Sequence, residues 1–457
     1  MTQSALIRRW EEELASYGKE KAAAFLLKGQ RKGGLMYGDR AVCQALRPLF
    51  LARETYQILV RESQLLRSAL GRLWRDFRAD PAAFADLRFT AMEEELIALD
   101  AQVDHPDTFG RIDGILQKDG SVRFLEYNGE SPGGLGYGDA LGDLFESLPF
   151  FAKLQKEFGL TRCKMLPRVV NTYLNSWRQW CAARKVIPNR HPRVLILDLA
   201  GAPTIGEFRL FQTAFREAGC EVEIASPEDL HFNGTTLVVK GRPVDLVYRR
   251  LLSADLLVEP KMAQALLDAL AADRVFCGNG FGGYFFAHKG LLAHLSDPQR
   301  RPLDLTPAEL QSLASSLPWT RIAQKRARST APDGGGELQD LETIVLANAE
   351  QLVLKPAADY GGRDVVLGWR TEPEPWRSAW NRACEGRFIV QARIPLETLA
   401  SPWQQAGEVR RGDFRFDLAP YVLGGLKVEG LGVRLSQDEL LNVAAGGGSA
   451  VPAFLVG

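Results

Sequence analysis

The chain has 457 residues, of which 46% are hydrophobic and 25% charged, an ordinary globular composition with enough length for two or three domains. Lys plus Arg and Asp plus Glu both number 56, so we expect no nucleic-acid partner and no membrane partner. The six cysteines show no CxxC pair and no Cys/His spacing suited to zinc. Residues 1–21 are acidic where a signal peptide needs an apolar core, and no apolar run reaches transmembrane length, which favours a cytoplasmic location.

Residues 1–100 are predicted to form a helical N-terminal region. One face of a predicted helix carries leucines at helical spacing, separated by charged residues. These leucines are Leu59, Leu66, Leu70 and Leu73. A stripe of this kind is typical of a packing face, and nothing in this region carries chemistry.

A β-hairpin is predicted within Gly110–Gly134. Residues 111–116 form a short apolar run, residues 118–120 (Lys-Asp-Gly) are a turn signal, and residues 122–127 form a second run. The hairpin places polar side chains beside a glycine-rich turn, which makes it a candidate binding site.

Oxygen ligands for a metal ion are predicted on this hairpin. Residues two apart on a strand share a face, so Glu126 and Asn128 project together, and hairpin pairing can bring Asp113 opposite them. Mg²⁺ takes few protein oxygens and uses substrate phosphates for the rest of its octahedron. Arg111 would add a fixed positive charge where a phosphoryl group is transferred. The alternative is that Arg111 and Asp113 form a solvated ion pair and that Asn128 merely turns the chain.

Strands and helices alternate after the exposed linker at residues 187–192. Helical patterns precede it over residues 141–186. The following predicted elements are a strand at Val194–Asp198, a helix at Gly206–Glu217, and strands at Val222–Ile224 and Val244–Arg249. This alternation predicts a parallel sheet with covering helices.

A glycine run, Gly278–Gly283, matches G-x-G-x-x-G by letter and precedes a predicted helix that carries His288, Lys289 and Leu291. The match would indicate an NAD(P)-dependent oxidoreductase. Against it, the glycines come late in the alternating region, and the next segment is proline-rich rather than a second strand. No G-x-x-x-x-G-K-[ST] sequence exists, which excludes a P-loop enzyme.

The region after Leu338 has features of a phosphate site. Residues 351–356 form a predicted strand that ends in Lys355, and residues 357–366 form a glycine-containing loop. A lysine at a buried strand end needs an anionic partner, and a Gly-Gly loop exposes N–H groups that can surround phosphate oxygens. The alternative is a snorkelling lysine beside a plain hairpin. Further strands are predicted at Phe388–Ile394, Asp413–Val422 and Leu426–Leu435.

Six short motifs follow one another over about residues 105 to 450. They are Arg111-x-Asp113, Glu126-Tyr-Asn128-Gly-Glu130-Ser-Pro132, Val247-Tyr-Arg-Arg250, His288-Lys289-Gly-Leu-Leu292, Val353-Leu-Lys355-Pro356 with Gly361-Gly362, and Val390-Gln391. In this order they resemble the synthetase domain of glutathionylspermidine synthase and its circularly permuted ATP-grasp relatives. One departure is His288, where the family has asparagine before the first lysine.

The resemblance implies an α/β (α+β) protein with a circularly permuted ATP-grasp fold. The implied regions are a helical N-terminal region at 1–100, the metal-binding hairpin segment with helices at 101–186, a Rossmann-like pre-ATP-grasp region at 187–283, and the nucleotide-binding subdomains at 284–457.

The resemblance also assigns roles to individual residues. Asp113, Glu126 and Asn128 would hold Mg²⁺, and Arg111 would be the catalytic residue that contacts the transferred phosphoryl group. The implied ATP-binding residues are Lys289, Lys355, Tyr360, Gly361, Gly362, Arg363, Val390, Gln391 and Arg393. On the substrate side, Glu130 and Ser131 could read the acid or the amine, and the candidate carboxylate clamps are Arg250, Arg321, Arg415 and Arg434.

The implied activity is that of an ATP-dependent carboxylate–amine ligase, with ATP and Mg²⁺ as cofactors. A carboxylate attacks the γ-phosphate to give an acyl phosphate, and an amine then displaces phosphate to form an amide. The acid could be a peptide such as glutathione or an amino acid, and the amine a polyamine or another amino acid. The alternatives are a non-catalytic nucleotide-binding scaffold and the oxidoreductase that the glycine run suggests.

Overall fold

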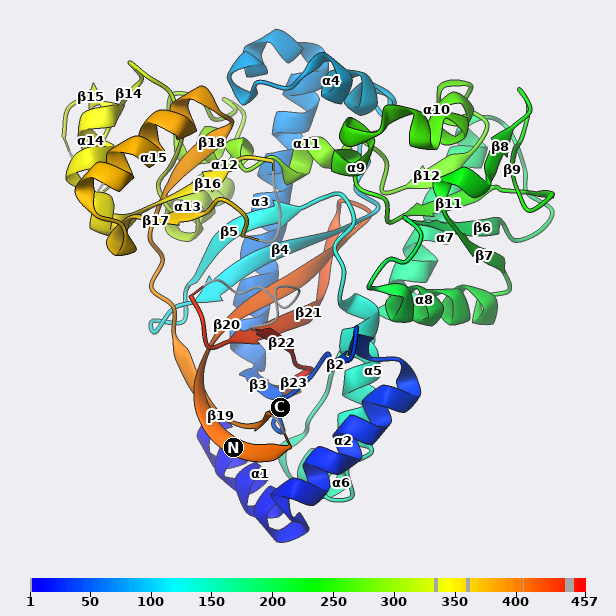
Figure 1. Cartoon of the computed structure of the whole chain (residues 1–457), viewed down its shortest axis with the longest axis vertical. Coiled ribbons are helices and arrows are strands. Elements are labelled where there is room, and N and C mark those ends of the chain that lie inside the picture. Colours follow the sequence, from blue (N-terminus) through cyan, green and yellow to red (C-terminus); the bar gives the residue numbers. More distant parts are fainter. Residues whose placement is uncertain (1, 333–335, 359–361, 406, 440–447) are drawn as a thin grey trace.

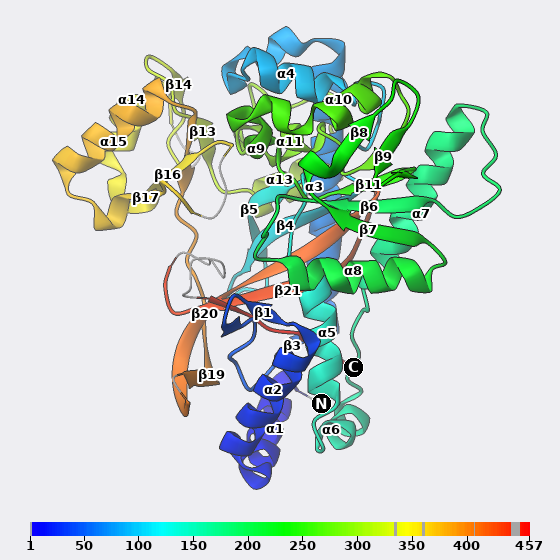
Figure 2. The same ribbon diagram turned by 45° about the vertical axis from the view of Figure 1, so that its right-hand side comes forward.

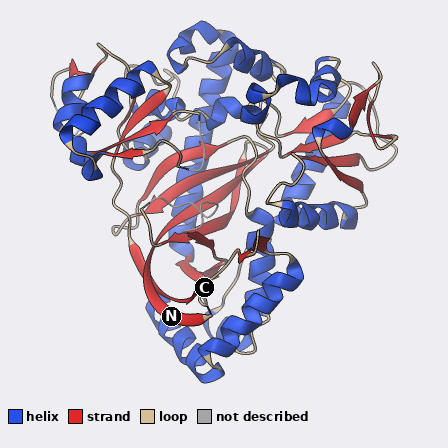
Figure 3. Ribbon diagram, viewed as in Figure 1, coloured by secondary structure: helices blue, strands red, loops and turns tan. Residues whose placement is uncertain are grey.

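The computed structural model describes residues 2–332, 336–358, 362–405, 407–439 and 448–457. The fold is mixed α/β, with a central antiparallel sheet flanked by two four-stranded sheets that carry helices (Figure 1, Figure 3). Both chain ends lie at the lower end of the molecule in Figure 1, near α1 (Gln3–Tyr17) and α2 (Lys19–Gly33). Within the described ranges, no helix has the length and apolar character needed to cross a membrane.

The N-terminal region is mostly helical, as predicted, and its longest helix, α3 (Arg53–Ala79), passes behind the central sheet (Figure 1). The predicted packing face is confirmed, because its leucines are all buried: Leu59, Leu66, Leu70 and Leu73. They share one hydrophobic core with central-sheet residues such as Phe124 and Val422. The short strand β3 (Leu49–Ala52) pairs in parallel with the last strand, β23 (Ala453–Val456).

The central sheet joins distant parts of the chain. Its strands are β4 (Phe109–Leu116), β5 (Val122–Asn128), β19 (Thr398–Gln405), β20 (Glu408–Leu423), β21 (Lys427–Ser436) and β22 (Gly448–Ala450). The order is β22-β21-β20-β4-β5, with β19 paired to β20, and every neighbouring pair is antiparallel. The predicted hairpin therefore lies at one edge of a sheet whose other strands come from the last 60 residues of the chain.

The parallel sheet confirms the predicted alternation of strands and helices. Its strands are β6 (Arg193–Leu197), β7 (Glu221–Ala225), β11 (Leu246–Arg249) and β12 (Phe276–Gly278), in the order β12-β11-β6-β7. The helices α7 (Leu166–Ala183) and α8 (Ile205–Glu217) pack on it through buried aromatic residues (Figure 2). The exposed side chain of Ile187 agrees with the predicted linker.

The glycine run is a close packing contact and not a dinucleotide site. The helix after it, α11 (Gly283–Ala287), has only five residues. A Cβ on Gly280 would lie 2.3 Å from the carboxylate of Asp100, and the N–H of Gly282 donates to the same group at 2.7 Å. These neighbours leave no room for a pyrophosphate, and the run does not line the cleft described below. These contacts therefore do not support the oxidoreductase that the glycine run suggests.

The small sheet contains the predicted lysine-bearing strand. Its strands are β13 (Thr320–Ile322), β18 (Phe388–Ala392), β16 (Leu352–Pro356) and β17 (Val366–Leu367), in that order. The helices α14 (Leu341–Ala347) and α15 (Pro373–Glu385) cover one face, where Trp376 and Trp380 are buried. The opposite face borders the central sheet (Figure 1).

The remaining elements connect these sheets or support their edges. The helices are α4 (Ala91–Ala98), α5 (Leu135–Glu146), α6 (Phe151–Phe158), α9 (Ser253–Val258), α10 (Gln264–Ala271), α12 (Gly290–Ser296) and α13 (Pro307–Ser316). The short strands are β1 (Met36–Tyr37), β2 (Arg40–Ala41), β8 (Leu230–Phe232), β9 (Leu237–Val239), β10 (Arg242–Pro243), β14 (Arg328–Ser329) and β15 (Gln339–Asp340).

Candidate functional site

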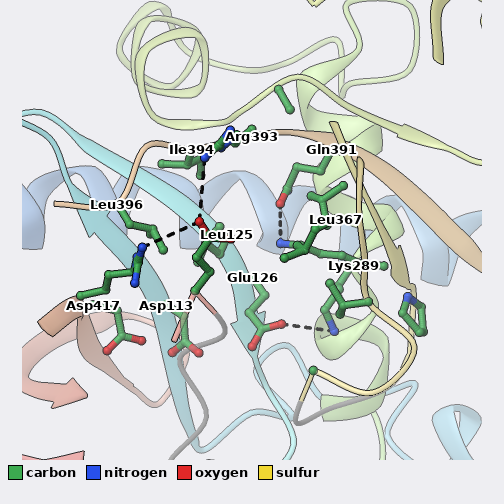
Figure 4. A pocket seen from close by; sticks show the side chains of 18 of the residues that line it. Asp113, Leu125, Glu126, Lys289, Leu367, Gln391, Arg393, Ile394, Leu396 and Asp417 are labelled. Carbon is green, nitrogen blue, oxygen red and sulfur yellow. Dashed lines mark hydrogen bonds and ion pairs between the residues drawn. The ribbon is translucent and has the colours of Figure 1, made fainter. Parts of the chain in front are cut away.

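A cleft of about 290 Å³ lies between the small sheet and the central sheet (Figure 4). It brings together these predicted site residues: Asp113, Glu126, Lys289, Lys355, Gly362, Arg363, Gln391, Arg393 and Arg434. Residues that sequence reasoning missed also line it, namely Leu367, Trp369, Asp417 and Glu439. We call this space the inter-sheet cleft.

The hairpin β4–β5 has the predicted register. Asp113 pairs with Glu126, and Arg111 pairs with Asn128. A β-bulge follows Asp113, because Gly114 pairs with Phe124 and leaves Leu125 as the extra residue. Figure 4 shows the carboxylates of Asp113, Glu126 and Asp417 side by side along one wall.

Two arginines hold the Asp113 carboxylate. Arg111 donates to both carboxylate oxygens, at 2.7 and 3.1 Å, and Arg434 donates to Oδ2 at 2.7 Å. Burial would raise the pKa of Asp113, but the charges of Arg111 and Arg434 hold it well below its usual range. Asp113 is therefore an ionised, buried carboxylate. The alternative interpretation of the sequence, a solvated ion pair between Arg111 and Asp113, is wrong.

Arg434 connects Asp113 to Asp417 on the neighbouring strand. Its Nε donates to Asp417 Oδ2 at 2.8 Å, and its backbone N–H donates to Oδ1 at 3.0 Å. Arg111 lies on the other side, where its Nη1 donates to the carbonyl of Gly133 at 3.0 Å. Positive and negative groups thus alternate from Arg111 to Asp417, and all of them except Arg111 line the inter-sheet cleft.

The two predicted lysines face the cleft from the opposite side. Lys289 Nζ lies 3.2 Å from Glu126 Oε2, and Lys355 Nζ donates to Gln391 Oε1 at 2.7 Å. Burial lowers the pKa of Lys355 to about 8, while the nearby charge of Glu126 opposes that shift. A lysine with this pKa is partly neutral near pH 8 and gains from an anionic ligand.

The strand after the lysines only partly matches its predicted role. Gln391 lines the cleft, whereas Val390 is fully buried against α15, because alternate residues of a strand face opposite sides. The Arg393 guanidinium lies 4.2 Å from the centroid of the Trp369 ring, and the Trp369 indole N–H donates to Glu439 at 3.0 Å. Of the predicted loop, Gly362 and Arg363 line the cleft, and Tyr360 and Gly361 lie outside the described residues.

The predicted substrate residues Glu130, Ser131 and Arg250 lie outside the cleft. Glu130 is buried and accepts hydrogen bonds from Arg249 Nη1 at 2.8 Å and from the N–H of Ser253 at 2.7 Å. Ser131 donates to the carbonyl of Arg249, and Arg250 donates to the carbonyls of Ser131 and Pro132. These contacts fix the loop after β5.

The other two candidate clamps differ from each other. Arg415 lines the inter-sheet cleft, 3.8 Å from Glu439. Arg321 is buried on strand β13 of the small sheet and donates to Ser329 Oγ at 2.7 Å.

Arg250 belongs to a second polar group, at the carboxyl ends of β6 and β11. The chain leaves β6 towards β7 on one side, and β11 lies on the other, which makes this the topological switch point of the parallel sheet. Burial raises the pKa of Asp198, which follows β6. Among the described residues, the hydroxyl of Tyr248 and Nε of Arg250 are buried without hydrogen-bond partners. Open parallel sheets bind ligands in this kind of crevice.

His288 and Lys289 lie between α11 and α12, and not on the single helix that the sequence predicts. The N–H of Lys289 donates to the carbonyl of Ala357, at the end of β16, at 2.7 Å, which breaks the helix. His288 is buried, and its Nδ1 accepts the N–H of Gly290 at 3.2 Å. Burial, aided by the charge of Arg387, lowers the pKa of His288 to about 3.

The melting temperature should therefore depend on His288 at mildly acidic pH. The unfolded chain takes up a proton near pH 6.5 and the folded chain does not, so stability from this group is present above pH 6.5 and decreases as pH falls towards 3. In melts followed by circular dichroism between pH 7 and 4, His288→Asn should lose less stability than the wild type. The exposed His231→Asn is the matched control. Equal pH profiles for the wild type and His288→Asn would refute a neutral, buried His288.

The hairpin residues fit a divalent cation by the chemistry of their donor set. Asp113 is ionised and has four acceptor positions, of which the arginines occupy three. The side-chain nitrogen of Asn128 is buried without a partner among the described residues, so its amide can turn its oxygen to a cation without losing a hydrogen bond. Within those residues, no three His, Cys, Asp or Glu side chains form a cluster suited to a metal on their own. Carboxylates alone therefore do not complete the coordination shell of a cation here. The amide oxygen of Asn128 and oxygens of a bound substrate would have to supply the remaining positions.

Comparison with solved structures shows what the fold resembles. A glutathione synthetase-like effector from Globodera pallida, solved in its apo form, superposes with a TM-score of 0.61 and 10% identity over 95% of this chain and 96% of that chain. D-alanyl-alanine synthetase A from Vibrio cholerae is also 10% identical and covers 51% of this chain and 68% of that one, but its TM-score of 0.26 supports no argument. No protein-family model and no curated protein matches the sequence. The chain therefore has a mixed α/β fold that resembles the fold of this glutathione synthetase-like effector over nearly the whole of both chains.

Proposed function

We propose that the protein is an ATP-dependent carboxylate–amine ligase that forms an amide bond through an acyl phosphate, as glutathionylspermidine synthase does. One observation carries the proposal: Lys289 and Lys355 from one side of the inter-sheet cleft meet Glu126 and Asp113 from the other. Phosphoryl transfer needs positioning and charge neutralisation rather than covalent help from the protein, and this cleft supplies both signs of charge. The likeness to a glutathione synthetase-like effector supports the same class.

ATP is proposed to bind with its phosphates at Lys289 and Lys355 and its adenine near residues 390–393. The side chains available for the adenine are Gln391 and Arg393, since Val390 points into the core. Loop residues 360–363 would cover the phosphates. Gly362 has a positive φ of 73°, a conformation that favours glycine. Because glycine has no side chain, a phosphate can approach the backbone N–H groups there.

Asp113, Glu126 and Asn128 would hold Mg²⁺. When bound, Mg²⁺ neutralises charge on the phosphates during transfer. Glu126 is paired with Lys289, so the phosphates of ATP would compete with Glu126 for Lys289 and release the carboxylate.

The chemistry then has two steps. An oxygen of the substrate carboxylate attacks the γ-phosphorus of ATP, and the bond between that phosphorus and ADP breaks. The amine nitrogen next attacks the acyl carbon, phosphate leaves, and the amine proton passes to solvent or to phosphate. Arg111, fixed on Asp113 and Gly133, would stabilise the charge on the transferred group.

The acid or the amine is proposed to bind between Arg434 and the loop at residues 130–133. Arg434 lines the cleft, and Arg250 lies behind the loop at the switch point, with its Nε available as a donor. Glu130 and Ser131 would act through the loop that they fix. A peptide such as glutathione or an amino acid could be the acid, and a polyamine or a second amino acid the amine.

A circularly permuted ATP-grasp arrangement is part of the proposal. The central sheet supports it, because this sheet combines strands from residues 109–128 with strands from residues 398–450. In the sequence, the parallel sheet and the small sheet lie between these two segments.

One observation favours a non-catalytic nucleotide-binding scaffold instead. Asp113 is held by two arginines and Lys289 is paired with Glu126, so these charged groups can satisfy one another without a substrate. A scaffold would keep ATP binding and lose turnover.

A phosphate-release screen with ATP, Mg²⁺ and paired pools of acids and amines decides between these functions. Release that requires one acid and one amine together supports the ligase. A thermal-shift assay runs in parallel, in which ATP with Mg²⁺ should raise the melting temperature and NAD or NADP should not. ATP binding without release from any pair would favour the scaffold, and a shift with the dinucleotides alone would restore the oxidoreductase.

The affinity for ATP should fall as pH rises through about 8. Free Lys355 loses its proton there, and bound phosphates favour the protonated form, so binding above pH 8 takes up a proton. The loss should approach about tenfold per pH unit. Calorimetric titrations at pH 7 to 9 in two buffers of different ionisation enthalpy measure both effects. Lys355→Arg, which keeps its charge, should lose this dependence, and a wild-type affinity that is constant from pH 7.5 to 9 would contradict the assignment.

A further inference from the structure

A buried polar trio lies behind the hairpin, on the face opposite to the inter-sheet cleft. Arg67, in the middle of α3, donates to Asp107 through Nε at 2.9 Å and Nη2 at 2.6 Å. Asp107 precedes β4 and also accepts the hydroxyl of Tyr127. Tyr127 lies on β5 between Glu126 and Asn128. The trio therefore joins the long N-terminal helix to the strand that carries two proposed metal ligands.

The three side chains are almost completely removed from solvent, with exposed fractions of 2% for Arg67, 0% for Asp107 and 3% for Tyr127. A buried ion pair is weak evidence for stability, because removing two charges from water costs about as much as their attraction returns. Its best-attested use is to fix a register that apolar packing leaves open. The Arg67 guanidinium also lies 4.4 Å from the Phe286 ring centroid, which restricts its position further.

The hairpin has a register that needs fixing. Its bulge leaves Leu125 unpaired, and moving the bulge by one residue along β5 would turn Glu126 to the opposite face of the sheet. Tyr127 is the second residue after the bulge, paired with Ile112. Its hydroxyl fills the space over Gly110, where a Cβ would lie 2.2 Å from that oxygen. A shifted strand would lose this site.

We infer that Arg67, Asp107 and Tyr127 are positioning residues that hold β5 in the one register that points Glu126 and Asn128 at the proposed Mg²⁺ and ATP. The effect of the trio on Mg²⁺ binding rests on the proposed function, whereas its effect on the register of the hairpin does not. The helix α3, for which the sequence predicts only packing, thereby acts on the site from behind the sheet.

Tyr127→Phe tests the inference, since it removes one hydroxyl and leaves the pair between Arg67 and Asp107 in place. In the ATP-free protein, hydrogen–deuterium exchange should become faster at the amides of residues 122–128. The Mg²⁺ concentration needed for half of the ATP-induced thermal shift should rise about tenfold, as for other groups that orient metal ligands from behind. Arg67→Lys, which keeps the charge and loses the fork, should show both effects more weakly.

Tyr284→Phe is a matched control elsewhere in the core. Tyr284 also donates its hydroxyl to a buried carboxylate, Glu93, which is paired with Arg387. This control should leave exchange in residues 122–128 and the Mg²⁺ requirement unchanged. Wild-type exchange in Tyr127→Phe would overturn the inference, whether or not ATP binds. Faster exchange with no ATP-induced shift in any variant would support the register role and contradict the proposed function.

Discussion

Replacing Glu126 by glutamine should reduce ATP-dependent phosphate release by about 10²-fold to 10³-fold while the fold survives. The substitution removes one charge at nearly constant shape from a side chain that is partly exposed in the inter-sheet cleft. Lys289 remains able to bind phosphate, so ATP should still bind. The lost metal ligand should be partly replaced at high Mg²⁺, and a titration of release against Mg²⁺ should show this partial rescue.

Glu350→Gln is the control for this change, because it makes the same substitution at an exposed position outside the cleft. It should release phosphate at the wild-type rate with the wild-type Mg²⁺ requirement. If Glu126→Gln were nearly as active as the wild type, the hairpin would have no part in the chemistry.

Replacing Asp113 by asparagine should damage both the fold and turnover. The change leaves the guanidinium of Arg111 without its carboxylate and Arg434 with Asp417 alone. Breaking a buried pair on one side costs about 3 kcal/mol or more, which for 457 residues unfolding together corresponds to a fall of about 3 °C or more in the melting temperature. Calorimetric or circular dichroism melts measure the fall, and phosphate release should decrease at least as much as in Glu126→Gln.

The double variant Arg111→Met with Asp113→Asn separates the two effects of Asp113. Removing the uncompensated charge should restore part of the melting temperature, because a buried pair replaced by uncharged groups is often neutral for stability. Turnover should stay absent. A double variant no more stable than Asp113→Asn would show that the arginine pair is not what Asp113 contributes to stability.

The local elements could be predicted because their signals are local. The turn at residues 118–120 and the flanking apolar runs defined the hairpin and placed Asp113 opposite Glu126. The strand that carries Lys355 and the alternating strands and helices after residue 192 could be predicted from local patterns in the same way. The break between α11 and α12 was not, since it depends on the hydrogen bond of the Lys289 N–H to Ala357, a residue 68 positions later in the chain.

The floor of the site could not be predicted for the same reason. Asp113 and Arg434 are 321 residues apart, and no short pattern joins them. Both Asp417 and Arg434 lie in strands that the sequence predicts, at Asp413–Val422 and Leu426–Leu435, and antiparallel pairing of these strands places the two residues opposite each other. The sequence could not show whether Arg249 or Arg250 is the partner of Glu130, because the two arginines are adjacent. Strand β11 ends at Arg249, and the residue at which the strand ends determines which arginine faces Glu130.

The central sheet pairs strands that are made at very different times during synthesis in the cell. Strand β4 pairs with β20, whose residues 408–423 are made about 300 residues later. At a synthesis rate of about 5–20 residues per second, the open side of β4 stays unpaired for about 15–60 s on the ribosome. An unpaired strand edge is a template for association with other chains. Production of this protein should therefore depend on chaperones that shield nascent chains, and ribosomes stalled in the last quarter of the message should release aggregation-prone products.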